Sequence, residues 1–453
     1  MANEVVESLV ARSRAAQKQI ENYTQEQVDA ICKMLAKVVY DNAEMFARMS
    51  VDETRMGVYE DKVAKCKGKS RIIWHNMDGK KSVGIIEVDE EAGLAIVAKP
   101  MGVVGAAMPC TNPVVTPMCN GMFAIKGRNS IIVAPHPRAK KVTKLLVDMY
   151  HEELRKMGVP EDIFLAIENP SIEDTTDLMA AVDVVLATGG KGVVVSAYSS
   201  GKPSYGVGAG NVQGLFDDDV NIPEAVTKII ASRTFDNGII CSGDQTLIAP
   251  ESKYDEIIAE FKKQGAFFTD DPAVVDKFRN AVFPGGAMNK ELVGQSVQKI
   301  AAAAGVEVPE GTRVIIVKTD KYGKDDVLSK EKMCPFMSSY SYKTWEEAVA
   351  IAKANLLVEG AGHSCSVQSN NQEHIEYAGL QLPVSRVLVN QSCATMNGGA
   401  FANSLSPTTT LGCGSWGNNS ISENLSYFHL FNKSRIAYTK KNWSQPSDEE
   451  IWK

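Results

Sequence analysis

Val182-Asp-Val-Val-Leu-Ala-Thr-Gly-Gly190 is the stretch that decides the fold, because a short apolar run rich in valine ends there in two glycines. Apolar residues at consecutive positions, rather than at alternate ones, are typical of a strand that is buried on both faces. Glycines directly after such a strand allow the backbone amides at a helix start to approach an anion. The stretch therefore predicts a buried parallel strand, a turn and a helix.

Three earlier stretches repeat the same order of strand and helix. The apolar runs cover 103–108, 130–134 and 163–167, and segments of helical character begin after Pro113, at about Arg138 and at Ser171. Strands and helices in strict rotation predict an α/β fold with a parallel sheet covered on both faces, which is the layout of a dinucleotide-binding domain. No GxGxxG follows the first strand, so the turn at 187–190 is the candidate phosphate-binding turn.

The remaining segments extend this domain plan. Helical spacing of apolar residues over about 4–50 predicts two opening scaffold helices. Two β-rich runs around a polar turn predict a hairpin over about 82–98, which is either an oligomerisation arm or a simple surface ribbon. We expect a nucleotide-binding domain over 1–234, a catalytic domain over 235–424 and a tail over 425–453 that pairs with the hairpin arm of a neighbouring subunit.

The composition argues against several classes of protein. The 453 residues are 44% hydrophobic and 23% charged, and no apolar run is long enough to cross a bilayer, which predicts a soluble protein. The first residues lack the apolar core of a secretory signal, so we expect a cytoplasmic location. A net charge of −7 with scattered basic residues favours neither nucleic acid nor membrane as a partner. The nine cysteines form no CxxC pair, which predicts neither disulfides nor a metal site.

A series of motifs spread over nearly the whole chain points to one family. The central motif is Arg233-Thr-Phe-Asp-Asn-Gly-Ile-Ile-Cys-Ser-Gly-Asp-Gln245. The others are Pro109-Cys-Thr-Asn-Pro113, Ala187-Thr-Gly-Gly190, Gly206-Val-Gly-Ala-Gly-Asn211, Glu331-Lys-Met-Cys-Pro335, Gly360-Ala-Gly-His363 and Thr410-Leu-Gly-Cys-Gly-Ser-Trp-Gly417. In sequence and order these motifs resemble CoA-acylating aldehyde dehydrogenases of the aldehyde dehydrogenase superfamily. The resemblance implies a Rossmann-type nucleotide-binding domain, an α/β catalytic domain, a small β arm, and a homodimer or homotetramer.

The resemblance also implies the catalytic residues. Cys241 matches the family's nucleophile, whose thiolate attacks an aldehyde carbon. The side-chain amide of Asn112 matches the donor to the oxyanion, with the backbone N–H of Cys241 as the second donor. The alternative for Asn112 is a plain Asn-Pro turn, and for Cys110 and Cys119 we favour a structural role.

The fate of the thioester on Cys241 separates two branches of the family. Hydrolytic relatives carry a glutamate that activates water, whereas the matching stretch 206–211 contains no acid. The resemblance therefore implies that the thiol of coenzyme A takes the acyl group, in a reaction that is reversible because thioester exchange is nearly thermoneutral. His363 either assists deprotonation of that thiol or only positions a loop.

The nicotinamide cofactor follows from the same comparison of motifs. Glu331 matches the residue that binds the nicotinamide ribose, and a cationic Arg138 or a neutral His136 would suit a 2′-phosphate, which favours NADP over NAD without excluding NAD. The residues assigned to the cofactor are Thr188, Gly189, Gly190, Gly208, Glu331, Pro135, His136, Pro137 and Arg138.

Weaker sequence similarities indicate the class of substrate. Segments 39–46, 56–65, 112–120 and 450–452 are most similar to CoA-dependent succinate-semialdehyde dehydrogenases. A buried second carboxylate would need a cation or several donors. Arg386 does not discriminate, because relatives acting on uncharged aldehydes have a similar arginine; Asn120, Ser242 and Thr395 are candidate donors. The alternatives are an acylating acetaldehyde or sulfoacetaldehyde dehydrogenase, or an assembly protein of filaments or shells.

Overall fold

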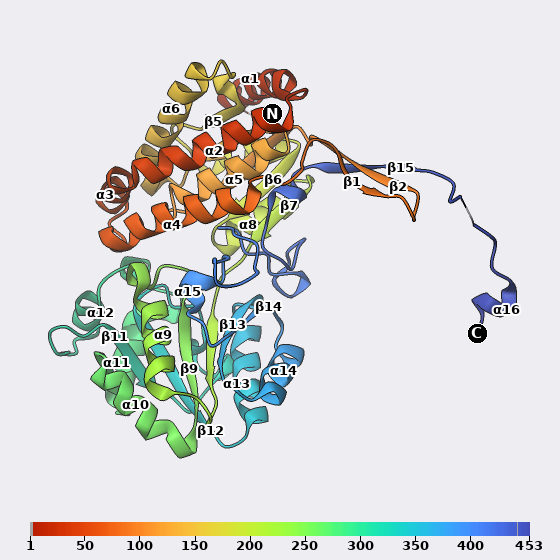
Figure 1. Cartoon of the computed structure of the whole chain (residues 1–453). Helices are drawn as coiled ribbons and strands as arrows, with labels where there is room; N and C mark the ends of the chain where they lie inside the picture. Colours follow the sequence, from red (N-terminus) through yellow and green to blue (C-terminus); the bar gives the residue numbers. More distant parts are fainter. Residues whose placement is uncertain (1–2, 442) are drawn as a thin grey trace.

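The computed structural model describes residues 3–441 and 443–453, and it contains two lobes, each built on a parallel sheet. A small antiparallel sheet projects from the first lobe, and the C-terminal helix lies beyond its tip (Figure 1). None of the helices among the described residues is both long and apolar enough to span a bilayer.

The first lobe contains a five-stranded parallel sheet in the order β5-β4-β3-β6-β7. Its elements alternate as β3 (Val103–Ala107), α5 (Val115–Lys126), β4 (Ser130–Ala134), α6 (Lys140–Lys156), β5 (Phe164–Ala166), α7 (Ile172–Ala181), β6 (Val184–Thr188), α8 (Lys191–Ser199) and β7 (Ser204–Val207). The predicted α/β class and the predicted strand–helix rotation are confirmed. Only β7, which is short and begins with a serine, was not predicted.

The order of the strands creates a switch point in this sheet. From β3 the chain moves outward through β4 to β5 and then returns to the other side of β3 with β6. Neighbouring strands whose connections leave in opposite directions open a crevice at their carboxyl ends, where ligands of such folds bind. The residues that follow Ala107 and Thr188 therefore face one another at the same edge of the sheet.

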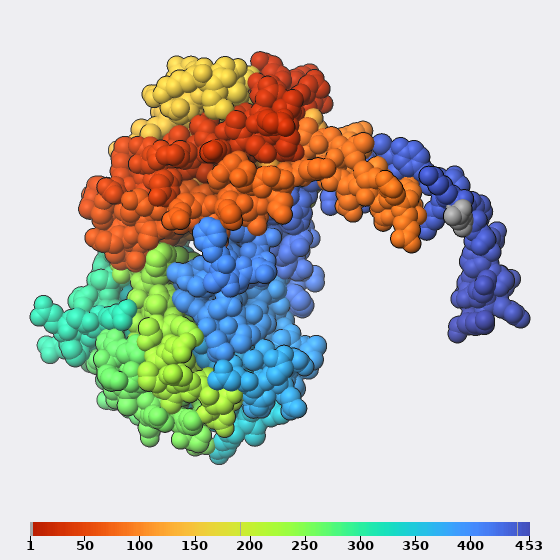
Figure 2. All heavy atoms as spheres, in the orientation of Figure 1, coloured from red at the N-terminus to blue at the C-terminus, as the bar shows by residue number. Residues whose placement is uncertain are grey.

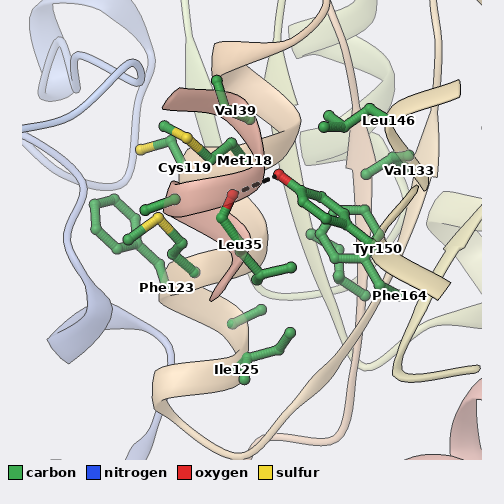
Figure 3. Close-up of a cluster of buried hydrophobic side chains, with 14 of the residues drawn as sticks. Leu35, Val39, Met118, Cys119, Phe123, Ile125, Val133, Leu146, Tyr150 and Phe164 are labelled. Carbon is green, nitrogen blue, oxygen red and sulfur yellow. Dashed lines mark hydrogen bonds between the residues drawn. The ribbon is translucent and has the colours of Figure 1, made fainter. Parts of the chain in front are cut away.

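Four helices open the chain: α1 (Glu4–Ile20), α2 (Gln25–Asp41), α3 (Ala43–Thr54) and α4 (Tyr59–Met77). Two helices were predicted over about 4–50, whereas three begin there, because Asn42 ends α2 and precedes α3 with no loop between them; α4 lies beyond that range. Figure 3 shows how α2 packs through Leu35 against apolar side chains of α5 and α6. The buried hydroxyl of Tyr150 donates to the carbonyl oxygen of Leu35 at 3.2 Å, so the one polar atom of that ring is satisfied.

The second lobe contains a seven-stranded parallel sheet in the order β10-β11-β12-β9-β8-β13-β14. The strands are β8 (Val212–Phe216), β9 (Asp244–Pro250), β10 (Ala266–Thr269), β11 (Val314–Lys318), β12 (Phe336–Tyr342), β13 (Gly362–Gln368) and β14 (Val384–Val389). The helices are α9 (Ile222–Thr234), α10 (Tyr254–Lys263), α11 (Pro272–Val282), α12 (Val297–Ala304), α13 (Trp345–Val358), α14 (Gln372–Gln381) and α15 (Cys393–Met396).

The chain passes from the first sheet to the second before residue 235, where the domain boundary was expected. β7 belongs to the first sheet and β8 to the second, so the chain crosses between Val207 and Val212. We therefore propose that the second domain begins in this loop and includes β8 and α9. This loop is part of the stretch 206–211, which has no glutamate where hydrolytic relatives carry one. The stretch therefore lies at the junction of the two lobes.

The projecting sheet consists of β1 (Gly84–Asp89), β2 (Leu94–Lys99) and β15 (Asn432–Ala437), and β1 and β2 form the predicted hairpin. β15 pairs antiparallel with β2 of its own chain, from Asn432↔Lys99 to Ala437↔Leu94. β15 therefore extends the predicted hairpin to a three-stranded sheet within one chain, and pairing of the tail with the arm of a neighbouring subunit stays a prediction. Figure 2 shows the arm and the tail standing clear of the two lobes, with α16 (Asp448–Ile451) at the far end.

Candidate active site

A cavity of about 320 Å³ brings together residues from both lobes. Helices α4 and α5 contribute one side, and the segment around Cys241 and the chain from 394 to 411 contribute the other. Four of the residues predicted from the sequence border it: Cys241, Asn112, Ser242 and Thr395. Among the described residues, none of those that border the cavity is an aspartate or a glutamate.

Cys241 lies in the turn between η3 (Phe235–Gly238) and β9. Asp236 and Asn237 take left-handed backbone conformations in η3, and Gly243 closes the turn by donating from its N–H to the carbonyl oxygen of Ile240 at 3.0 Å. The left-handed residues reverse the chain after α9, so that the thiol of Cys241 is presented at the cavity and is partly exposed.

The surroundings of Cys241 keep its thiol protonated in the unliganded chain. Burial raises the pKa of Cys241 to about 12, and the negative charge of nearby Glu331 acts in the same direction. The buried guanidinium of Arg386 lowers the pKa of Cys241 but does not outweigh them. An additional positive charge at the cavity would therefore be needed to favour the thiolate.

Two N–H donors belong to residues that border the cavity. The described residues offer no acceptor to the backbone N–H of Cys241 or to the amide nitrogen Nδ2 of Asn112. The amide oxygen Oδ1 of Asn112, in contrast, accepts a hydrogen bond from Nζ of Lys65 at 2.7 Å. Both predicted oxyanion donors are thus free to bind an oxygen in the cavity.

Asp236 anchors two lysines of α4 at the edge of the cavity. Oδ2 of this fully buried carboxylate accepts from Nζ of Lys65 at 2.6 Å and from Nζ of Lys62 at 3.0 Å. Burial raises the pKa of Asp236, but the charges of Lys65 and Lys62 outweigh burial and hold it below its ordinary value. The carboxylate is therefore ionised and paired with two lysines.

Lys69 provides a second cation, one helical turn further along α4. Its Nζ donates to the carbonyl oxygen of Gly398 at 2.8 Å, and the described residues supply no carboxylate to pair with it. Burial lowers the pKa of Lys69 to about 8, and the charge of Lys65 adds to this. Beside it the buried hydroxyl of Thr409 also lacks a partner among the described residues.

The predicted nucleotide-binding residues lie at the carboxyl ends of β6 and β4. Thr188 ends β6, and α8 begins after Gly190 without a side-chain cap, so no side chain competes with an anion for the start of this helix, where the N–H of Val193 already donates to the carbonyl oxygen of Gly190. After β4, Nδ1 of His136 accepts from the backbone N–H of Arg138 at 3.1 Å. Burial and the charge of Arg138 lower the pKa of His136, and Arg138 itself is exposed and reaches the carbonyl oxygen of Thr54.

Glu331 and Gly208 lie on the other side of the nucleophile. Oε1 of Glu331 accepts from the backbone N–H of Gly210 at 2.9 Å. Burial and the charge of Glu359 raise the pKa of Glu331 to about 8. Gly208 borders a separate cavity of about 480 Å³, together with Tyr198, Glu359 and Trp416.

Two predicted site residues are not at the cavity. His363 is fully buried in β13, its ring nitrogens have no partner among the described residues, and burial lowers its pKa to about 3. Asn120 is fully buried in α5, where Oδ1 accepts from Oγ1 of Thr410 at 3.3 Å. Both side chains lie in the core because β13 and α5 are buried all round, and the roles of His363 with the CoA thiol and of Asn120 with the substrate stay predictions.

Sequence reasoning missed the lysines of α4. They stand at positions 62, 65 and 69, a spacing that places them on one face of a helix. The spacing of the three lysines is visible in the sequence, but a row of lysines on one helix face normally indicates a solvated surface. In the structure this helix is partly buried, and Cys66 and Ser70 are among its buried residues. Nothing in the sequence indicates that the face meets the turn before Cys241.

Comparison with known proteins identifies the family. A model described as the aldehyde dehydrogenase family matches residues 1–402. The chain is 56% identical over 453 residues, the whole length of both, to a succinate-semialdehyde dehydrogenase (acetylating) of Clostridium kluyveri. It is 41% identical to a sulfoacetaldehyde dehydrogenase of an Acholeplasma species, over 98% of this chain and 92% of the relative.

Solved structures share the whole fold. An acetylating aldehyde dehydrogenase from Geobacillus thermoglucosidasius superposes with a TM-score of 0.93 at 36% identity, covering 98% of each chain. A propionaldehyde dehydrogenase of Rhodopseudomonas palustris, solved with bound CoA and an acylated cysteine, has a TM-score of 0.87 at 25% identity, covering 96% of this chain and 98% of that one. An engineered glycolyl-CoA reductase with bound NADP+ has a TM-score of 0.85 at 25% identity, covering 96% of this chain and 97% of that one.

Proposed function

The chain belongs to the aldehyde dehydrogenase family, and we propose that it is a CoA-acylating enzyme that interconverts succinyl-CoA and succinate semialdehyde through a thioester on Cys241. The observation that carries the proposal is the cavity at Cys241: within the described part of the chain it combines two N–H donors and a lysine that have no acceptor or carboxylate partner, respectively, with a wall that includes no carboxylate.

The first half of the reaction is supported by the groups around the thiol. The sulfur of Cys241 attacks the aldehyde carbon and gives a thiohemiacetal whose oxygen carries the developing negative charge. Nδ2 of Asn112 and the backbone N–H of Cys241 donate to that oxygen. When bound, the oxidised nicotinamide supplies the positive charge that favours the thiolate and accepts the hydride.

The second half is supported by the absence of a base for water. No aspartate or glutamate borders the cavity among the described residues, and Glu331 is engaged with the backbone of Gly210. A water molecule near the thioester therefore has no carboxylate to take its proton. The thiol of coenzyme A takes the acyl group instead, in line with the relative solved with CoA and an acylated cysteine.

Lys69 supports a substrate with a distal carboxylate. A partly buried ammonium without an anionic partner is costly, and a substrate carboxylate would both pair with it and accept from the hydroxyl of Thr409. Ser242 and Thr395 border the same cavity and offer further hydroxyl groups. Acetaldehyde would leave Lys69 unpaired, whereas sulfoacetaldehyde also carries an anion and is the second candidate, favoured by the Acholeplasma relative.

NADP is the proposed cofactor, with NAD as the alternative. The uncapped start of α8 after Gly190 fits the diphosphate, and Arg138 is an exposed cation at the end of β4 that fits a 2′-phosphate. A homodimer or homotetramer is proposed through the arm, because Ile85, Val88 and Tyr438 expose apolar surface there. All nine cysteines are free thiols, which suits a reducing cytoplasm.

The test is the consumption of NADPH by the purified full-length chain with succinyl-CoA, acetyl-CoA or sulfoacetyl-CoA as the acyl donor. The proposal expects succinyl-CoA to give the highest kcat/KM and NADH to be the poorer reductant. Faster turnover of acetyl-CoA would contradict the assignment of Lys69, and faster turnover of sulfoacetyl-CoA would establish the second candidate.

A further inference from the structure

We propose that Lys65 is a positioning residue that fixes the side-chain amide of Asn112 with its N–H groups towards the substrate oxygen. The proposal rests on the thioester chemistry proposed above. Nζ of Lys65 contacts Oδ1 of Asn112 at 2.7 Å and Oδ2 of Asp236 at 2.6 Å, so it bridges the oxyanion donor and the segment that leads to Cys241.

The chemistry of an ammonium group fixes the orientation of the amide. An ammonium has only donors, so the Asn112 atom that it contacts must be the oxygen, and Nδ2 must point away from Lys65. Rotating the amide by half a turn would place donors against donors and would turn Oδ1 towards the negative oxygen of the intermediate. Lys65 therefore selects the one orientation in which Asn112 can act as a donor.

Asp236 holds Lys65 in place. Its Oδ1 accepts from the backbone N–H of Val58 at 2.8 Å, and its Oδ2 is shared by Lys65 and Lys62. Gly57 makes room for this carboxylate, because a Cβ there would overlap Oδ1 of Asp236. Because Asp236 is fixed from several sides and lies in η3, the Lys65–Asp236 bond ties α4 to the nucleophile segment, and the Lys65–Asn112 bond ties the amide of Asn112 to α4.

Loss of the Lys65 ammonium would have two consequences for Asn112. The amide would lose the contact that distinguishes its oxygen from its nitrogen, and Asp236, with one cation fewer, would attract the Nδ2 group to itself. The amide N–H would also lose the polarisation that a cation on Oδ1 provides. Both effects weaken stabilisation of the intermediate without removing a substrate contact.

The experiment is a double-mutant cycle of Lys65→Met and Asn112→Ala, measured as single-turnover reduction of nucleotide by aldehyde. We expect Lys65→Met alone to slow this step by about 10- to 100-fold, somewhat less than the loss on deletion of an oxyanion donor. In the Asn112→Ala background it should add less than about twofold. Because this half-reaction precedes any contact with CoA, a failure of acyl transfer to CoA would count against the proposed function and not against Lys65.

Controls separate positioning from other roles. Lys65→Arg should retain more activity than Lys65→Met, since a guanidinium also has only donors. If Lys65→Met does not fold, Lys65→Arg replaces it in the double-mutant cycle. Lys67→Met, on the exposed side of the same helix, should leave the rate unchanged. The loss with Lys65→Met should appear in kcat, be equal for succinate semialdehyde and uncharged butanal, and leave the KM for nucleotide nearly unchanged.

Two results would overturn the proposal. If the fold-losses in rate of the two single variants multiply in the double variant, Lys65 acts independently of Asn112. A loss confined to succinate semialdehyde would show that Lys65 binds the distal carboxylate itself.

Discussion

The backbone of Gly210 lies directly against the carbonyl group of Cys241, so that a Cβ at position 210 would overlap the carbonyl oxygen. The N–H of the same glycine donates to Glu331 at 2.9 Å. The loop that joins the two lobes thus supports the nucleophile segment from one side, and Lys65 and Asp236 hold it from the other.

Replacement of Gly210 by alanine should displace this segment. The atoms that a Cβ at position 210 would meet all belong to the backbone of Cys241, so we expect a strain of about 1–3 kcal/mol. If that strain falls on the geometry of Cys241, the rate of nucleotide reduction by aldehyde drops by about 10- to 100-fold. Stopped-flow measurement of nucleotide reduction checks this, with Gly379→Ala in α14, which meets no atom within 4 Å, as the control. An unchanged rate in Gly210→Ala would show that the contact does not matter for catalysis.

Replacement of Lys69 by methionine should remove the preference for a charged substrate. A hydrogen bond to a charged group contributes about 1.5–3 kcal/mol, so kcat/KM for succinate semialdehyde should fall by about 10- to 100-fold. Butanal, which has the same chain length and no carboxylate, should react at the unmodified rate or faster because the cavity becomes more apolar. Equal losses for both aldehydes would assign Lys69 a structural role.

The same lysine predicts a pH dependence. Burial lowers the pKa of Lys69 to about 8, so its positive charge is present below pH 8 and is lost as the pH rises above it. The ratio of kcat/KM for succinate semialdehyde to that for butanal should therefore be constant below about pH 7 and fall above about pH 8. The ratio cancels the titration of Cys241, which both substrates share. A ratio that rises or stays constant to pH 10 would contradict the assignment.

Much of the fold could be predicted because local patterns agreed with it. The apolar runs that became β3, β4, β5 and β6 were predicted close to their observed bounds, and each is followed by a helix. The boundary expected at 235 placed β8 with the first domain, whereas β8 pairs within the second sheet, since a strand buried on both faces has the same pattern in either sheet. Pairing partners are set by contacts distant in sequence.

The site was predictable only where a motif carried it. Cys241, Asn112, Ser242 and Thr395 meet at one cavity, but Lys65 and Lys69 reach it through the packing of α4 against the other lobe. The residues next to a side chain in the sequence likewise do not determine the direction in which it points. His363 and Asn120 occur in suggestive motifs, yet they lie in elements buried on all sides.

The most direct test of the account is rapid-quench mass spectrometry of the chain mixed with succinate semialdehyde and NADP+ in the absence of CoA. We predict one succinyl group per chain, on the peptide that contains Cys241, formed together with one equivalent of NADPH and discharged when CoA is added. Cys241→Ala should bind nucleotide and form no adduct. Repeated turnover to free succinate without CoA, or an adduct on another residue, would contradict the thioester mechanism.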